Sequence, residues 1–308
     1  MNTITIVAPV LIMLIIGVIC RKTAMLSQTG VNNIKKFITT FALPLTIFHA
    51  VATAEYNKDV LLVFGMMLAV VIIAFLLGFA LKGLVKEPYR KYFPYIMTIY
   101  EGGMIAYPLY QSLCGTEQMS NIAIIDVPCG VFAFGIYFGM LTMTDQGTKV
   151  SGKQLLLNAL KTPTFVALLL GLLVGSLGLM NHFLATDVSQ VYMAVKDMLT
   201  APLSAMILLC VGYEFQLEKS SIGMCLKTVL VRFVIQVALL VVVIFLARKW
   251  GLSEFMQIGL IIYIMTLPSL CLSSFVKNEE AGKYMSTTSS LYMFITLVAY
   301  IVLASILG

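Results

Sequence analysis

Apolar residues run through the chain in long stretches that short polar breaks separate. A helix of about 20 apolar residues crosses the roughly 30 Å hydrocarbon core of a bilayer. On this criterion the sequence predicts an all-α integral membrane protein whose spans follow the apolar stretches. We expect ten transmembrane helices, at residues 3–20, 34–54, 59–82, 93–113, 121–144, 163–181, 191–216, 224–248, 254–276 and 286–307.

The composition supports a membrane protein and excludes an ordinary soluble fold. Hydrophobic residues make up 60% of the chain and charged residues only 11%. Soluble domains are about 45–50% apolar and about 25% charged. The first apolar stretch has no Lys or Arg before Arg21. A cleaved secretory signal would need such a basic segment, so we expect residues 3–20 to be retained as the first span.

The basic residues predict the orientation of the chain. Cytoplasmic loops of membrane proteins carry an excess of Lys and Arg. If both termini lie outside, the inner connections hold 15 of the 20 basic residues. These are Arg21, Lys22, Lys35, Lys36, Lys82, Lys86, Arg90, Lys91, Lys149, Lys153, Lys161, Lys219, Lys227, Lys277 and Lys283. We therefore expect both termini to be extracytoplasmic.

Prolines recur at nearly constant spacing in the two halves of the chain. The paired residues lie 154, 158 and 160 positions apart, and are Pro9 with Pro163, Pro44 with Pro202, and Pro108 with Pro268. An odd number of helices in each copy places the second copy upside down, which is the inverted-repeat plan of many secondary transporters. The predicted units are a five-helix repeat at 1–144, a cytoplasmic linker at 145–162 and an inverted five-helix repeat at 163–308.

The fourth and ninth spans are expected to be broken. Pro108 and Pro268 lack the N–H that an unbroken helix requires, and Gly102 and Gly103 loosen the fourth span further. Irregular backbone survives at membrane depth only against protein or water. We expect the two breaks to cross near mid-depth. The N-terminal end of a half-helix suits a carboxylate and a C-terminal end suits a cation. The alternative is that these prolines only kink the helices and shape their packing.

Polar side chains near the breaks are the candidate site residues. Glu101 lies at mid-depth, where a carboxylate costs about 2.5–3.5 kcal/mol on insertion scales, so it should face a cavity or be protonated. Thr266 and Ser269 flank the second break, and these three residues are the expected side-chain contacts of a substrate. Asp126 opens the fifth span, either in the same cavity or near the outer mouth.

Other reactive residues suggest no further chemistry. The six cysteines form no CxxC pair and His49 and His182 have no partner at metal-ligand spacing, so we expect no metal, no cofactor and no enzymatic site. Arg232, near the inner end of the eighth span, is interpreted as a snorkelling residue. There is no basic patch with interleaved aromatics for nucleic acid.

Four segments resemble the auxin efflux carrier family, in particular its bacterial members. They are IVAPVLIMLIIGVICRKTAML (6–26), FALPLTIFHAVA (41–52), EGGMIAYPLYQSLCG (101–115) and TAPLSAMILLCVGYEF (200–215). Pro268 also falls where the family has its second crossover proline. The resemblance covers essentially the whole chain. It implies ten helices in two inverted repeats, a homodimer, and export or exchange of small organic acids such as malate, malonate or indole-3-acetate by an elevator-like movement.

The chain departs from this family at two positions of the fourth span. Glu101 stands where the family usually has Asn, and Ala106 stands where it usually has Gly. A permanent anion at a carboxylate site would repel the substrate. Either Glu101 is protonated during binding, or the protein handles a different substrate.

Three functional hypotheses follow. The leading one is a secondary transporter of small organic anions with a crossover site made of Glu101, Gly102, Gly103, Pro108, Thr266, Pro268 and Ser269. Coupling to H⁺ or Na⁺ would involve Glu101 and Asp126. The first alternative is a cation–proton antiporter that uses these two carboxylates as ion ligands. The second is a membrane receptor without transport activity, which the short inner connections disfavour.

Overall fold

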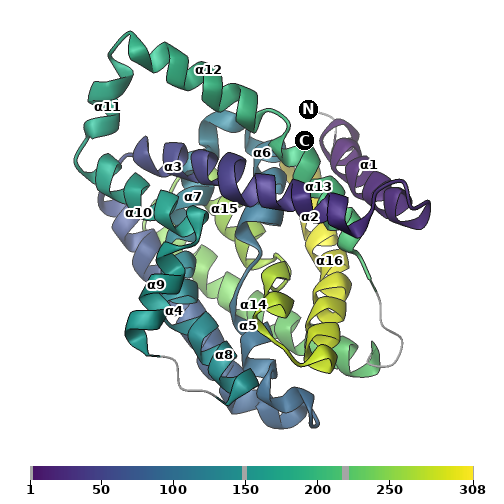
Figure 1. Ribbon diagram of the computed structural model, residues 1–308. Coiled ribbons are helices and arrows are strands. Elements are labelled where there is room, and N and C mark those ends of the chain that lie inside the picture. Colours follow the sequence, from purple (N-terminus) through teal and green to yellow (C-terminus); the bar gives the residue numbers. More distant parts are fainter. Residues whose placement is uncertain (1–2, 148–150, 217–221, 308) are drawn as a thin grey trace.

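The chain is helical throughout the part that the computed structural model describes, residues 3–147, 151–216 and 222–307. The elements before residue 148 are α1 (Thr3–Lys22), α2 (Gln28–Phe37), η1 (Ile38–Ala42), α3 (Leu43–Ala52), α4 (Lys58–Leu81), η2 (Lys82–Leu84), η3 (Tyr89–Lys91), α5 (Phe93–Thr98), η4 (Gly102–Ala106), α6 (Tyr107–Cys114), η5 (Thr116–Gln118), α7 (Met119–Phe132), η6 (Ala133–Tyr137) and α8 (Phe138–Gln146). Figure 1 shows them in purple to blue-green.

The elements after residue 150 complete the bundle. They are α9 (Gly152–Leu160), α10 (Pro163–Ser176), α11 (Leu179–Leu184), α12 (Val188–Thr200), α13 (Leu203–Glu214), α14 (Ile222–Lys249), α15 (Glu254–Ile264), η8 (Leu270–Phe275) and α16 (Glu279–Leu307). The predicted all-α membrane architecture is confirmed. Two basic residues counted for the orientation, Lys149 and Lys219, and part of the predicted linker lie outside the described residues.

Each of the ten predicted spans falls on helical structure, but helix length does not establish ten crossings. Within the described part of the chain, seven continuous helical runs are long and apolar enough to cross a membrane: 3–22, 28–52, 58–84, 116–146, 188–214, 222–249 and 279–307. An eighth counts only if α9 and α10, which bend by 86°, are taken as one span. The fourth and ninth predicted spans are interrupted, which is why neither passes a test for one straight helix.

The outer surface of α14 shows where lipid contacts the protein. Leu230, Val234, Val241 and Phe245 are 60–66% exposed and recur at helical spacing. The same helix buries Arg232 and Gln236 on its opposite side. An exposed stripe of large aliphatic side chains is stable when hydrocarbon covers it. The helix therefore presents one face to the bilayer and a polar pair to the protein interior.

Glycines allow two helix pairs to approach closely. A Cβ on Gly17 of α1 would lie 2.2 Å from the Leu209 carbonyl oxygen of α13, and one on Gly171 of α10 would lie 3.0 Å from Val51 Cβ of α3. Gly17 and Gly171 are 154 residues apart, and Val51 and Leu209 are 158 apart. These are the spacings of the first two proline pairs, and a glycine lies at the close approach in both helix pairs.

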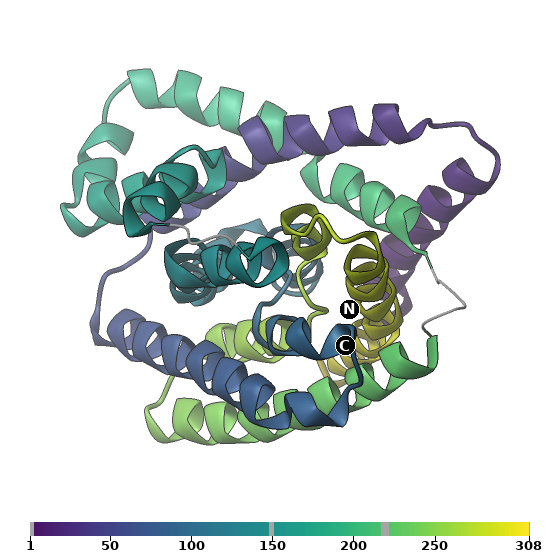
Figure 2. The same ribbon diagram turned by 60° about the horizontal axis from the view of Figure 1, so that its bottom comes forward.

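Contacts within each half are also alike. α4 contacts α5 and α7, while α14 contacts α15 and α16 in the second half. The start of α1 and the end of α16 lie side by side in both views (Figures 1 and 2). There the Tyr300 hydroxyl donates to the Ile6 carbonyl oxygen over 3.1 Å. The two described ends of the chain are therefore at the same end of the bundle.

Candidate functional site

Two helices are broken in the middle of the bundle, and their extended segments touch. The first break separates α5 from η4 at Ile99–Glu101, and the second separates α15 from η8 at Met265–Ser269. Tyr100 and Pro268 form an isolated antiparallel bridge, and the Glu101 N–H donates to the Leu267 carbonyl oxygen over 3.0 Å. The structure therefore has the predicted crossing of the fourth and ninth spans.

The two prolines lie differently with respect to the breaks. Pro268 is within the second break, as predicted. Pro108, in contrast, lies in the first turn of α6, after the first break and after the wide turn η4. In that turn the Tyr107 N–H reaches back to the Gly102 carbonyl oxygen, five residues earlier. A π-helical turn accommodates a residue that has no backbone N–H to donate, so the helix continues through Pro108 and does not break there.

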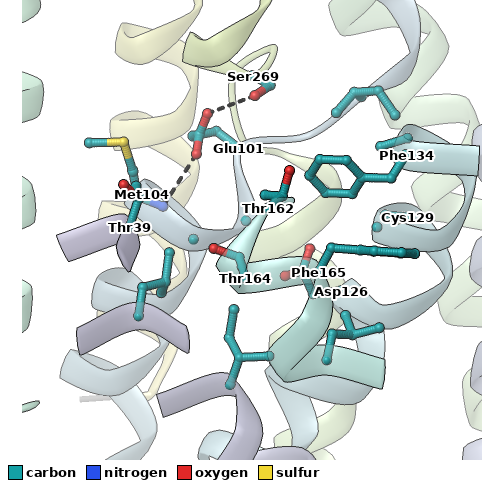
Figure 3. Close-up of a pocket in the computed structure, with 18 of the residues that line it drawn as sticks. Thr39, Glu101, Met104, Asp126, Cys129, Phe134, Thr162, Thr164, Phe165 and Ser269 are labelled. Carbon is teal, nitrogen blue, oxygen red and sulfur yellow. Dashed lines mark hydrogen bonds between the residues drawn. The ribbon is translucent and has the colours of Figure 1, made fainter. Parts of the chain in front are cut away.

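Glu101 joins the N-terminal ends of both half-helices. Its side chain is buried, with the residue 5% exposed. One carboxylate oxygen accepts the Met104 N–H over 3.3 Å, at the start of η4. The other accepts the Leu270 N–H over 2.6 Å and the Ser269 hydroxyl over 3.0 Å, at the start of η8. Figure 3 shows the carboxylate between Met104 and Ser269. Helix N-termini stabilise anions, and here the bound anion is a side chain of the protein.

Asp126 belongs to the same site. Its carboxylate accepts hydrogen bonds from the Tyr263 hydroxyl of α15 and from the Tyr107 hydroxyl, the latter over 3.4 Å. The side chain lies against Gly102, where a Cβ would come within 2.5 Å of an Asp126 carboxylate oxygen. Of the two positions that the sequence left open, Asp126 occupies the cavity.

A cavity of about 430 Å³ borders the crossover. Its walls come from η1, α3, α7, η6, α8 and α10 as well as from the broken helices (Figure 3). Most of the lining is apolar. The lining side chains that carry charge, hydroxyl or aromatic groups are Thr39, Tyr100, Glu101, Asp126, Phe134, Phe138, Lys161, Thr162, Thr164, Phe165, Tyr263, Ser269 and Phe275.

The remaining predicted site residues divide into two groups. Gly102, Gly103 and Ser269 line the cavity. Thr266 is buried within the break, and its hydroxyl donates to the Tyr263 carbonyl oxygen over 2.8 Å. That hydroxyl is therefore bonded to the C-terminal end of the helix that precedes it, α15. Gly103 has a packing role as well, because a Cβ there would lie 2.7 Å from a Leu43 methyl group.

Arg232 is a site residue that the sequence reading misplaced. It does not snorkel to the surface: the residue is 0% exposed, inside the bundle. Its guanidinium donates to the carbonyl oxygens of Ile96, Ile99 and Thr266. Because Arg232 lies about three turns from the start of α14, sequence position alone could not distinguish a side chain that reaches the inner surface from one that reaches the crossover. An arginine among apolar residues was the only available signal.

Comparisons with known proteins agree with this architecture. A search of the curated proteins found no match. The profile of the family described as membrane transport protein matches residues 3–307, which is almost the whole chain. That family contains the auxin efflux carriers whose segments the sequence resembles. The crossed broken helices and the cavity beside them therefore lie in a chain that belongs to the membrane transport protein family.

Proposed function

We propose that this protein is a secondary transporter of small organic anions and that it binds them where its broken helices cross. The observation that supports this most is the arrangement around Glu101. Three donors from two half-helices, the Met104 N–H, the Leu270 N–H and the Ser269 hydroxyl, converge on one carboxylate. The same donors suit the carboxylate of a substrate, since half-helix N-termini at mid-membrane commonly bind anionic groups.

Substrate binding then requires Glu101 to release these donors. Protonation of Glu101 removes its negative charge and weakens its hold on two backbone N–H groups. A substrate carboxylate can then take its place, and one proton accompanies one substrate. The other charged groups around this position are Asp126 across the cavity, Lys161 at its rim, and the Lys35–Glu214 ion pair of a neighbouring cavity that shares Ser269.

The cavity walls define the class of anion further. Phe134, Phe138, Phe165 and Phe275 supply aromatic surface, and Lys161 is the one basic residue among the described residues that line the cavity. Apolar walls with a few polar groups select a ligand with an apolar body and one oriented polar end. We infer that a monocarboxylate with an apolar or aromatic body binds more tightly than a compact dicarboxylate.

The architecture that accompanies this function is also a proposal. Equivalent proline spacings and equivalent helix contacts support two inverted five-helix repeats at 1–144 and 163–308, joined by the linker at 145–162. Movement of the crossover helices against the rest would alternate access, in the manner of an elevator. The Lys and Arg distribution supports extracytoplasmic termini in a bacterial inner membrane. A homodimer is proposed from the family resemblance.

Cation–proton antiport is the second candidate function, and one observation favours it. Glu101 and Asp126 line the same cavity, as two ion-binding carboxylates would. Their oxygens, however, accept hydrogen bonds from Ser269, Tyr263, Tyr107 and backbone N–H groups. Membership of a transporter family leaves the receptor hypothesis without support.

Radiolabelled uptake into proteoliposomes tests the proposal, because one proton that accompanies one monocarboxylate leaves no net charge to measure as a current. We expect saturable uptake of indole-3-acetate, and smaller uptake of malate and malonate, all in Na⁺-free buffer. Empty liposomes are the control. Currents from Na⁺ or pH jumps without any carboxylate, recorded on a solid-supported membrane, would favour the antiporter instead. The absence of uptake for all three acids would contradict the proposed substrate class.

A methyl group on Gly102 should impair transport selectively. In Gly102→Ala the new Cβ would lie 2.5 Å from Asp126 and 3.1 Å from the Tyr263 ring, so both must shift. We expect at least a tenfold lower transport efficiency, which corresponds to about 1.4 kcal/mol. The matched control is Gly130→Ala in the same cavity, where the nearest atom would lie at 3.5 Å and efficiency should stay near wild type. Equal efficiencies in the two variants would contradict this prediction.

A further inference from the structure

The carbonyl ends of the two broken helices meet a positive charge of the protein itself. The Arg232 guanidinium donates through Nη1 to the Ile96 carbonyl oxygen. Through Nη2 it donates to the Ile99 carbonyl oxygen over 3.2 Å and to the Thr266 carbonyl oxygen over 3.3 Å. Ile96 and Ile99 belong to the end of α5, and Thr266 follows the end of α15. One side chain therefore joins the C-terminal ends of both half-helices.

Neighbouring groups complete the surroundings of this cation. The Tyr100 and Tyr292 rings lie 5.3 and 5.2 Å from the guanidinium carbon, within cation–π distance. One turn along α14, the Gln236 amide donates to the Met97 carbonyl oxygen over 2.9 Å and accepts the Tyr100 hydroxyl over 2.5 Å. Among the described residues, Arg232 has no ion pair with an acidic side chain. Backbone carbonyls and aromatic faces are thus its principal partners.

The guanidinium lies at helix ends that favour a cation. Helix C-termini carry partial negative charge, and in transporters with discontinuous helices the unwound carbonyls and half-helix C-termini coordinate the coupling cation. In this chain the corresponding carbonyl oxygens already accept hydrogen bonds from the guanidinium of an α14 side chain. A metal cation would have to displace Arg232 from all three oxygens.

We propose that Arg232 is a resident cation that replaces a coupling metal ion at the crossover. It balances the carbonyl ends of α5 and α15, while Glu101 balances the amide ends of η4 and η8. Binding at the crossover is consequently independent of Na⁺. This inference deepens the proposed transport function and rests on it for its role in transport, but the cation site itself can be tested without any organic substrate.

Arg232→Ala removes the resident cation, so we expect the variant to be stabilised by a cation added to the solution. The variant leaves the carbonyls and a space of guanidinium size. We expect its melting temperature in detergent to rise by roughly 2 °C when guanidinium exceeds its Kd about tenfold. Urea at the same concentration is the control, because it has the same shape without the charge. Na⁺ should stabilise the variant more than choline does at equal ionic strength, although less than guanidinium.

Wild-type protein and a second arginine variant serve as matched controls. Arg248→Ala removes an exposed arginine from the other end of α14. It and the wild type should melt at the same temperature in NaCl and in choline chloride, and show no difference between millimolar guanidinium and urea. Arg232→Lys retains a cation and should keep Na⁺-independent melting.

Several results would overturn the proposal. One is specific stabilisation of the wild type by Na⁺ over choline. Another is an Arg232→Ala protein that responds identically to guanidinium and urea. If Arg232→Ala cannot be purified, two measurements still test the proposal. They are the melting of the wild type in Na⁺ against choline and the melting of Arg232→Lys. Absence of organic-anion uptake would contradict the transport proposal alone, since these melting experiments contain no carboxylate.

Discussion

Glu101→Gln is expected to transport with an affinity that hardly changes with pH, whereas the wild-type affinity should fall as pH rises. In the wild type, the deprotonated Glu101 carboxylate holds the Met104 and Leu270 N–H groups and the Ser269 hydroxyl. Substrate binding then requires uptake of one proton. Above the pH at which Glu101 loses its proton, this linkage lowers the apparent affinity about tenfold for each pH unit.

The sign of this effect follows from which form competes with substrate. The anionic side chain competes and the neutral one does not, so affinity is highest at low pH and is lost as pH rises. Gln is neutral at every pH and competes only weakly. We would measure half-saturating substrate concentrations in proteoliposomes between pH 5 and pH 9. Glu55→Gln, at an exposed position, is the control and should retain the wild-type profile. A Glu101→Gln variant with the wild-type profile would disprove the coupling role.

Gly212→Ala is expected to destabilise the protein more than other glycine-to-alanine changes in the spans. A Cβ on Gly212 of α13 would lie 2.0 Å from the Leu14 carbonyl oxygen of α1, and the other near atoms are also backbone of Leu14. Backbone cannot rotate away as a flexible side chain can, so α1 and α13 must separate. Overpacking costs about 1–3 kcal/mol, and this case should lie at the upper end.

Thermal unfolding in detergent provides the measurement. A loss of about 3 kcal/mol lowers the melting temperature by roughly 5 °C in a chain of 308 residues. Gly65→Ala is the matched control, because Gly65 lies inside α4 and a Cβ there would meet nothing within 4 Å. Helix propensity alone should make Gly65→Ala neutral or slightly stabilising. Equal melting temperatures for the two variants would show that α1 and α13 do not depend on this close contact.

Much of the site could be predicted from the sequence because its signals are local. A proline removes a backbone donor wherever it stands, so broken fourth and ninth spans followed from Pro108 and Pro268. The location of the first break did not, because a π-helical turn after Gly102 accommodates Pro108 and moves the break to residues 99–101. Helical wheels assume one periodicity and cannot anticipate such a turn.

The partners of the charged residues depended on contacts between distant segments. Glu101 receives the N–H of Leu270 from 169 residues away, and Arg232 reaches Ile96 from 136 residues away. The contribution of Tyr263 to the Asp126 site is of the same kind. No pattern along the chain shows which side chain will meet which helix end, since that depends on how the broken helices cross.

The sequence by itself determined the membrane class, the family and the presence of broken helices, since apolar length, composition and proline chemistry act within one segment. Only the tertiary structure decided that Glu101 binds the amide ends and Arg232 the carbonyl ends of the same crossover. The physical reason is that a buried charge must find partners, and in a membrane these come from whichever backbone groups the fold leaves unpaired.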